Sequence, residues 1–163
     1  MAVGPATSEE PAVSGIDAVI KQSGAQSYWI RRVVAFVVDA VIVYVALGII
    51  ITLTALPFLV LSGTEVFGAL LAGTFSFLGG IMLVLYFAII EAYMGASFGK
   101  RALGLKVVAA GGRYPNGGEA LVRNLSKVYW LLLILDVVVG LATSKDYRQK
   151  YSDRVMGTTV LSV

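Results

Sequence analysis

Two long runs of the chain contain no charged residue. Residues 40–64 and residues 66–90 lack Asp, Glu, Lys and Arg entirely. Each run exceeds the ~20 apolar residues that an α-helix needs to cross the ~30 Å hydrocarbon core of a bilayer. The pattern therefore predicts two transmembrane helices, the first over about residues 32–55 and the second over about residues 69–93. Pro57 is expected to end the first helix, because proline lacks a backbone N–H.

A third apolar segment, residues 128–144, is shorter and is interrupted by Asp136. Its 17 residues are borderline for a full crossing of the bilayer. If the segment spans, the tail at residues 145–163 lies outside the cell with four basic side chains, against the rule that basic residues stay in the cytoplasm. If the segment re-enters or lies in the interface, the tail stays cytoplasmic. We favour the cytoplasmic tail and keep both alternatives open.

Basic side chains are concentrated in the loop at residues 94–127. The loop contains six Lys and Arg residues and a single acid, Glu119. Arg31 and Arg32 precede the first helix. Because basic residues flanking transmembrane helices favour the cytoplasmic side, we expect both the loop and the N-terminus to be cytoplasmic.

The same loop carries signals for a small β element. Leu105–Ala109 is rich in β-branched residues, and glycines at 111–112 and 117–118 are turn signals. The pattern predicts a short hairpin within the loop, and the strand-like segment Thr158–Val163 is a second candidate partner on the same side of the membrane. A helical approach to the third segment is expected around Leu121–Leu125.

Residues 1–27 are polar and rich in Gly, Ser and Ala, so we expect a disordered, uncleaved leader. Residues 28–163 form the expected membrane domain. The predicted fold class is an all-α membrane protein with two transmembrane helices, a third spanning or re-entrant segment and a small cytoplasmic β hairpin or strand element.

Composition agrees with a membrane protein and removes several functions. Hydrophobic residues make up 58% of the chain and charged residues 14%, against about 25% charged in soluble proteins. Cys and His are both absent, which excludes disulfides, thiolate or imidazole metal sites and nucleophilic mechanisms with a His base. We therefore expect no metal, no cofactor and no catalytic residue. The net charge of +3 lies beside hydrophobic segments without a nucleic-acid-binding module, so no nucleic-acid partner is expected.

Three acids lie in the predicted membrane segments: Asp39, Glu91 and Asp136. An acid at this depth costs several kcal/mol unless it is paired, protonated or facing water. Helix packing could bring the three together near the cytoplasmic leaflet, where they would bind a monovalent cation or exchange protons. The alternative interpretation is a structural network of ion pairs that fixes the positions of the helices.

Residues 95–101 superficially resemble a phosphate-binding loop, but the glycine spacing is one residue short and Arg101 stands where Ser or Thr is required. Nucleotide binding is therefore not expected. Lys100 and Arg101 are instead predicted to contact lipid phosphates or acidic side chains in a cytoplasmic turn.

Four motifs occur in a characteristic order: Trp29 to Arg32 with Ala35 and Asp39, then residues 97–108, then Arg123-Asn124, and finally residues 152–160. Together they resemble the RDD family of membrane proteins over about residues 28–163. The family's namesake Arg, Asp and Asp match Arg32, Asp39 and Asp153. Ser97 stands where Thr is common in the family, and Ser152 where His is common before the second Asp. The missing imidazole weakens any proton relay through the tail.

The resemblance implies a multi-pass protein of a prokaryotic inner membrane, with transport proposed for the family and sodium/proton antiport suggested for some members. A cytoplasmic tail would allow Arg32 to reach Asp153, so that the three namesake residues form one cluster at the inner face. The structural alternative for Asp153 is a capping or salt-bridge residue that docks the tail beneath the helices.

These observations support two functional hypotheses. The first is a small transporter that exchanges a monovalent cation for protons through Asp39, Glu91 and Asp136. Three helices enclose too little space for a pore, so such a transporter would be an oligomer. The second is a non-transporting scaffold or accessory subunit that binds lipid or a partner membrane protein. An enzyme acting on lipid head groups through Asp153 or Glu91 is the weakest alternative, because no nucleophile or metal site accompanies these acids.

Overall fold

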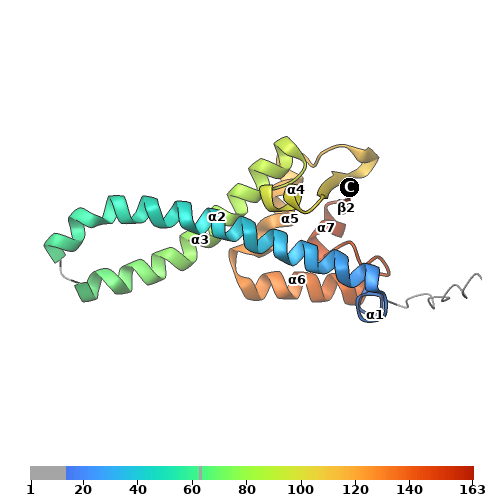
Figure 1. Ribbon diagram of the computed structural model, residues 1–163, viewed down its shortest axis with the longest axis horizontal. Helices are drawn as coiled ribbons and strands as arrows, with labels where there is room; N and C mark the ends of the chain where they lie inside the picture. Colours follow the sequence, from blue (N-terminus) through green and yellow to red (C-terminus); the bar gives the residue numbers. More distant parts are fainter. Residues whose placement is uncertain (1–13, 63) are drawn as a thin grey trace, which may run out of the picture.

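Two long helices dominate the computed structural model, which describes residues 14–62 and 64–163, with side chains described over 14–54 and 77–163. Helix α2 (Ser23–Ser62) and helix α3 (Thr64–Met94) run antiparallel as a projecting pair, and the other elements gather at one end of it (Figure 1). We call this end, where α2 begins and α3 ends, the base.

The two predicted transmembrane helices are confirmed. Ser23–Thr54 and Phe77–Met94 are each long and apolar enough to cross a membrane. The predicted end of the first helix is wrong, because α2 continues past Pro57 to Ser62, and no long connection follows. A proline removes one backbone hydrogen bond, but unwinding a helix in lipid would free further backbone groups where no water can bind them.

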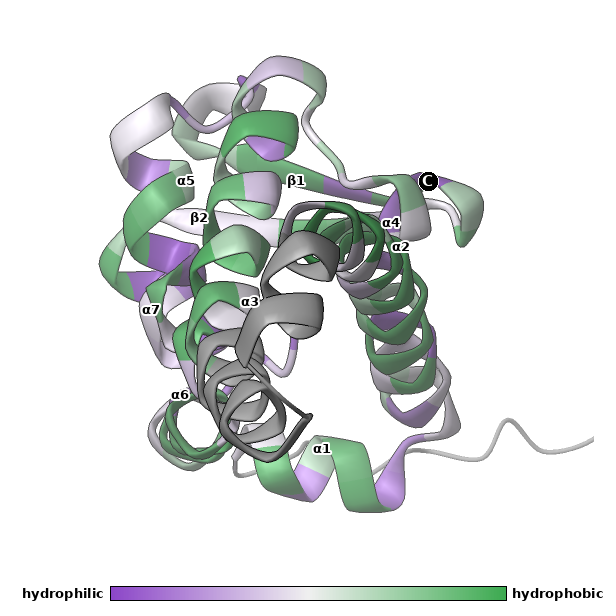
Figure 2. Ribbon diagram, turned by 90° about the vertical axis from the view of Figure 1, so that its left-hand side faces the viewer, coloured by the Kyte–Doolittle hydropathy of each residue, from purple (hydrophilic) through white to green (hydrophobic). Residues whose placement is uncertain are grey.

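The polarity of the described helices is reversed relative to a soluble protein. Val37, Val41 and Val45 on the outer face of α2 are more than half exposed, whereas Asp39 is 0% exposed. Figure 2 shows that most of the coloured part of α2 and most of α6 consist of hydrophobic residues. Exposed apolar and buried polar side chains are expected where the surrounding solvent is hydrocarbon.

Small residues let neighbouring backbones approach α3. A Cβ added to Gly79 would overlap the ring of Tyr44, and one added to Gly80 would overlap the carbonyl of Val128. The second predicted transmembrane helix has small residues at Gly73, Ser76, Gly79 and Gly80, a pattern that predicts close approach of a neighbouring element. The contacts at Gly79 and Gly80 confirm this prediction, whereas Gly73 and Ser76 lie outside the residues whose side chains the structure describes.

The segment before α2 is helical from Gly15 onward. Ser14 caps α1 (Gly15–Lys21) by accepting a hydrogen bond from the Asp17 amide at 3.2 Å, and the Gly15 amide donates to the Ser144 carbonyl at 2.7 Å. The disorder predicted for the leader is therefore wrong for residues 15–27, and its first 13 residues lie outside the described chain. A seven-residue helix has little stability of its own and depends on its tertiary contacts, so its local sequence is a weak signal.

The loop after α3 contains two short α-helices, one strand and two 3-10 helical turns. Its elements are α4 (Phe98–Ala102), β1 (Leu105–Ala109), η1 (Ala110–Gly112), α5 (Gly117–Asn124) and η2 (Leu125–Val128). The helical approach predicted before the third segment is confirmed by α5.

The predicted hairpin within this loop is wrong. Strand β1 pairs antiparallel with β2 (Thr158–Ser162), the alternative partner, with Leu105 opposite Ser162. Asn116 does not form a hairpin turn but caps α5: it accepts a hydrogen bond from the Glu119 amide, and the Glu119 carboxylate accepts one from the Asn116 amide. Turn and helix-start signals share Asn and Gly, so composition alone did not separate them.

The third apolar segment forms α6 (Trp130–Thr143), which is bent by 115° from the preceding helical segment. A helix of 14 residues is about 21 Å long, too short to cross the hydrocarbon core alone. The chain then passes through α7 (Tyr151–Val155) to β2. Because β2 pairs with β1, the loop and the C-terminal tail lie on the same side of the two long helices.

Candidate functional site

The base holds most of the buried charge of the described chain. The first anchor is Arg32, on α2, whose Nη2 donates to Asp153 Oδ2 at 2.5 Å and whose Nη1 donates to the Arg148 carbonyl at 2.7 Å. Tyr28, one turn earlier, donates to the carbonyls of Arg148 and Val160. The Trp29 indole donates to the Tyr147 carbonyl at 2.9 Å. These side chains dock the tail onto α2.

One expectation about the start of α2 changes with this arrangement, and another is confirmed. Tyr28 and Trp29 have the position of interfacial anchors in the sequence, but Tyr28 is buried and both bind the tail. The predicted contact between Arg32 and Asp153 is present at 2.5 Å. Asp153 therefore serves at least to join the tail to the long helices.

Asp39 is held by neutral donors. Its Oδ1 accepts hydrogen bonds from the Tyr86 hydroxyl at 2.7 Å and the Gly99 amide at 2.8 Å, and its Oδ2 accepts one from the Ser97 hydroxyl at 2.5 Å. A Cβ on Gly99 would overlap the Ala35 carbonyl, so only glycine brings this amide to the carboxylate. Through Asp39, the Ser97 and Gly99 hydrogen bonds hold the start of α4 against α2, and the Tyr86 hydrogen bond joins α3 to the same carboxylate.

Glu91, near the end of α3, is surrounded by cations. It forms an ion pair with Lys100 and accepts a hydrogen bond from the Asn124 amide nitrogen at 2.9 Å. Arg123 Nη1 lies 3.6 Å from its Oε2. Lys100, predicted to contact lipid phosphates or acidic side chains, therefore meets an acid, whereas Arg101 is exposed.

Asp136, on α6, binds the tail. It forms an ion pair with Lys150 and accepts hydrogen bonds from the Ser152 amide at 2.7 Å and the Ser126 hydroxyl at 2.7 Å. Gly140, one turn along α6, packs directly on the backbone of Lys150, where a Cβ would overlap it. The acid that interrupts the apolar segment is thus a docking point for the tail.

The three acids do not form one group. Asp39, Glu91 and Asp136 each have a separate set of partners, and the residues that the structure describes contain no set of three acidic, His or Cys side chains placed to hold a metal ion. The clustering expected from the sequence is therefore absent. Each buried carboxylate is paired or hydrogen-bonded to donors close to it, and this offsets the free-energy cost of burying its charge.

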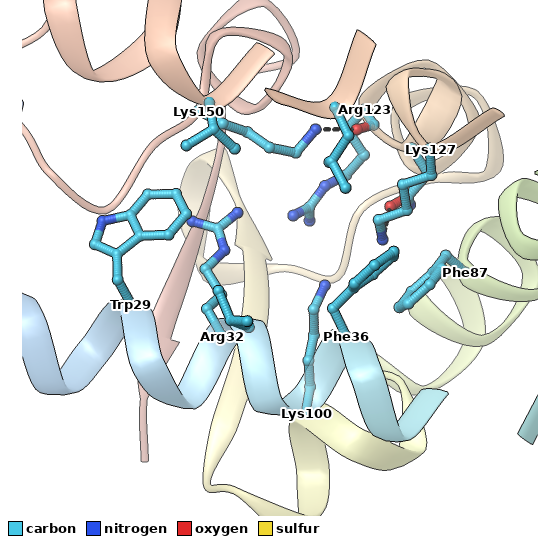
Figure 3. Close-up of a pocket in the computed structure, with 12 residues that line it drawn as sticks. Trp29, Arg32, Phe36, Phe87, Lys100, Arg123, Lys127 and Lys150 are labelled. Carbon is cyan, nitrogen blue, oxygen red and sulfur yellow. Dashed lines mark hydrogen bonds between the residues drawn. The ribbon is translucent and has the colours of Figure 1, made fainter. Parts of the chain in front are cut away.

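Five cations converge on one cavity instead. A cavity of about 100 Å³ lies between α2, α3, α5 and α6. Among the residues that the structure describes, its charged lining consists of Arg32, Lys100, Arg123, Lys127 and Lys150. Figure 3 shows their nitrogen-bearing ends directed toward a common space beside Trp29, Phe36 and Phe87. The paired acids Glu91, Asp136 and Asp153 lie behind this lining. Five buried cations against three acids leave an excess of positive charge.

Arg123 has unused hydrogen-bonding capacity in this cavity. Its side chain is 1% exposed, and its Nε and Nη1 atoms have no hydrogen-bond acceptor. The nearest carboxylate oxygen, Asp153 Oδ1, lies 2.9 Å from Nη2. A buried guanidinium with free donors is uncommon, because each unmade hydrogen bond costs free energy.

Lys127 is the cation of the cavity without a described acidic partner. Its Nζ donates to Asn124 Oδ1 at 2.6 Å and lies 3.0 Å from the centre of the Phe87 ring. In the described part of the chain no carboxylate lies within ion-pair distance of it. A buried ammonium held by an amide and a ring is a natural partner for an added anion.

The pKa shifts of the groups outside the transmembrane helices agree with this excess of positive charge. Burial lowers the pKa of Lys100 below its ordinary value despite the opposing charge of Glu91, and burial also lowers the pKa of Lys150 despite Asp153 and Asp136. Burial alone would raise the pKa of Asp153, but the charges of Arg123 and Arg32 outweigh it and hold that pKa below its usual range. The charged forms of Lys100 and Lys150 are therefore destabilised, whereas the charged form of Asp153 is strongly stabilised.

Sequence reasoning did not place Arg123, Lys127 and Lys150 in a site. Arg123 and Lys127 are four residues apart and therefore share one face of a helical segment, beside Asn124. That spacing within an otherwise apolar approach to a membrane segment was the available signal.

Comparisons with known proteins agree with the motifs of the base. The family model described as RDD family matches residues 27–157. No curated protein matches the chain, and no solved structure matches it. The matched range contains Arg32, Asp39 and Asp153, the buried residues that join α2, α4 and the tail. This chain is an integral membrane protein of the RDD family.

Proposed function

We propose that this protein is a membrane-embedded accessory or scaffold protein that binds an anionic group, a phosphate or a carboxylate, in the cationic cavity of its base. The observation that carries the proposal is the buried Arg123 guanidinium, with two nitrogen atoms free of acceptors, among five converging cations. Its partners are the lipid bilayer and, as the sequence suggests, a second copy or another membrane protein.

The charge of the cavity supports an anion over a cation. Cations entering proteins are bound by oxygen ligands, and the acids nearest the cavity are already neutralised by Lys and Arg. A phosphate or carboxylate would supply the acceptors that Arg123 lacks and would offset the repulsion among the five cations. The volume of the cavity, about 100 Å³, exceeds the ~10–15 Å³ that a single water requires.

Lys127→Gln tests the proposal without breaking an ion pair. Inorganic phosphate is expected to raise the melting temperature of the purified protein in detergent in a dose-dependent way, because a ligand that binds only the folded state stabilises it. The shift should shrink severalfold in Lys127→Gln. It should also shrink as the pH rises, because the lowered pKa values of Lys100 and Lys150 let these ammonium groups lose charge below the ordinary lysine range.

The matched control is Lys145→Gln, which removes the same charge from an exposed position outside the cavity. It should respond to phosphate like the unmodified protein. Equal phosphate shifts in both variants, or no shift in the unmodified protein, would overturn the proposal.

We further infer that the base lies in the cytoplasm, because Lys and Arg are concentrated at this end. Membership of the RDD family supports a prokaryotic inner membrane as the host membrane. The cysteine-free chain allows a direct test. Cysteines placed at Lys106 on β1 and at Val163, directly after β2, should react with an impermeant reagent only after lysis. A cysteine at Thr64, at the other end of α3, should react in intact cells. The reverse pattern would place the base outside.

Exchange of a monovalent cation for protons is the second candidate. One observation favours it: Asp39 is fully buried, and the partners recorded for it are the neutral groups of Tyr86, Ser97 and Gly99. Exchange would therefore depend on Asp39 rather than on a cluster with Glu91 and Asp136. Cation-driven proton movement that disappears in Asp39→Asn would support this candidate over the first.

A further inference from the structure

One wall of the cationic cavity is apolar. Val33 and Phe36 on α2 and Leu133 and Val137 on α6 line it. We call these four residues the apolar seam. In the described part of the chain, α2 packs mainly on α1, α3 and α4, whereas α6 packs mainly on α1, η2 and α7. The two helices that bear the seam therefore make few direct contacts with each other at most.

Both flanks of the seam face outward with apolar side chains. On α2, Val33 is 56% exposed and Val34 and Val37 are exposed as well. On α6, the residues beside the seam are exposed and apolar, namely Leu131, Leu132, Ile134, Leu135 and Val138. Such surfaces are stable only in contact with hydrocarbon, so the seam opens toward acyl chains.

We infer that the ligand of the cavity is a phospholipid with an anionic head group, drawn sideways from the surrounding bilayer, with its phosphate among Arg32, Arg123 and Lys127 and an acyl chain along the apolar seam. This inference rests on the proposed function and names the class of its ligand. Basic pockets between membrane helices are known to hold such head groups.

Two physical arguments select this ligand. A bilayer lipid is already present at the depth of the seam, whereas a free anion must shed its hydration and enter a cavity with apolar walls. A zwitterionic head group would bring its own ammonium among five cations, which repel it, so a net negative charge is required. The cavity therefore favours anionic over zwitterionic head groups, and the seam favours a lipid with an acyl chain over a free anion.

Val137→Phe tests the seam without touching a cation. Purified protein is mixed with phosphatidylglycerol or with phosphatidylcholine of the same chains, and retained lipid is measured by native mass spectrometry alongside the melting temperature. The unmodified protein is expected to retain and be stabilised by phosphatidylglycerol. Val137→Phe fills the seam and should reduce this retention severalfold, whereas Val138→Phe, one residue along α6 and outside the lining, should not.

The response to inorganic phosphate separates the two proposals and reports whether each variant is folded. If phosphate stabilises all three proteins but phosphatidylglycerol is retained no better than phosphatidylcholine, the lipid inference fails and the anion site stands. If Val137→Phe retains phosphatidylglycerol like Val138→Phe, the path along the seam is wrong. If neither phosphate nor lipid acts on the unmodified protein, both proposals fail.

A second measurement needs no variant and decides the matter if Val137→Phe does not fold. The deacylated head group, glycerophosphoglycerol, is compared with intact phosphatidylglycerol on the unmodified protein. Much tighter binding of the intact lipid supports the seam. Equal binding of the two would show that the chain contributes nothing and would overturn the inference.

Discussion

Replacing Asp153 with Asn is expected to destabilise the protein by about 3–5 kcal/mol, the range for removing one partner of a buried ion pair. The carboxylate lies fully buried between Arg32, at 2.5 Å, and Arg123, at 2.9 Å. Without its charge, two guanidinium groups remain buried beside each other. Denaturation in mixed micelles, followed by tryptophan fluorescence, measures the loss, because Trp29 packs against Arg32 and binds the tail.

The pH dependence of this effect has a fixed sign. The pKa of Asp153 in the folded protein is held below its usual range by the guanidinium groups, so its charge stabilises the fold at neutral pH. That stabilisation is lost as the pH falls through the lowered pKa. The difference in stability between the unmodified protein and Asp153→Asn should therefore be largest near neutrality and shrink in strong acid.

Asp146→Asn is the matched control for Asp153→Asn. Asp146 is an exposed acid of the same tail, and its Oδ1 accepts a hydrogen bond from the Arg148 amide at 2.9 Å, which an asparagine oxygen also accepts. Its stability should change by less than about 0.5 kcal/mol. Comparable losses for the two substitutions would contradict the role assigned to the buried cluster.

Asp39→Ala is expected to cost about 3 kcal/mol or more, because it leaves two buried donors and one partly buried donor without an acceptor, at roughly 1–3 kcal/mol each. These are the Tyr86 hydroxyl, the Ser97 hydroxyl and the Gly99 amide. Asp39→Asn should cost much less, since its oxygen still accepts from Tyr86 and Gly99 and its amide group can donate to the Ser97 oxygen. The comparison therefore separates hydrogen bonding from charge at one position.

The same pair of variants decides between the two functions. Proteoliposomes carrying a pH-sensitive dye are given a sodium or potassium gradient. We expect no proton movement beyond that of empty vesicles in the unmodified protein and none in either variant. Movement in the unmodified protein that is abolished in well-folded Asp39→Asn would establish exchange and overturn the accessory role.

The sequence by itself determined the membrane class and the location of the long helices. Uninterrupted apolar runs suffice for this. A segment that crosses hydrocarbon needs about 20 predominantly apolar residues, and hydrocarbon forces the backbone to form its hydrogen bonds within the helix. Local chemistry also fixed the strand at Leu105–Ala109 and the family motifs around Arg32 and Asp153. These features depend on neighbours in the chain.

Only the tertiary structure decided which charges meet. Arg32 and Asp153 are separated by 121 positions and Asp39 and Ser97 by 58, and no local pattern specifies which acid pairs with which donor. For that reason the three acids of the predicted membrane segments were expected to lie together near one leaflet. In the structure each carboxylate has its own set of hydrogen-bond or ion-pair partners. Arg123 and Lys127 are part of a site because the chain bends by 115° between η2 and α6, and the α5–η2 segment packs its side chains against α2 and α3. The cationic cavity is a product of packing, and packing over such distances is set by the sum of many contacts rather than by any one segment.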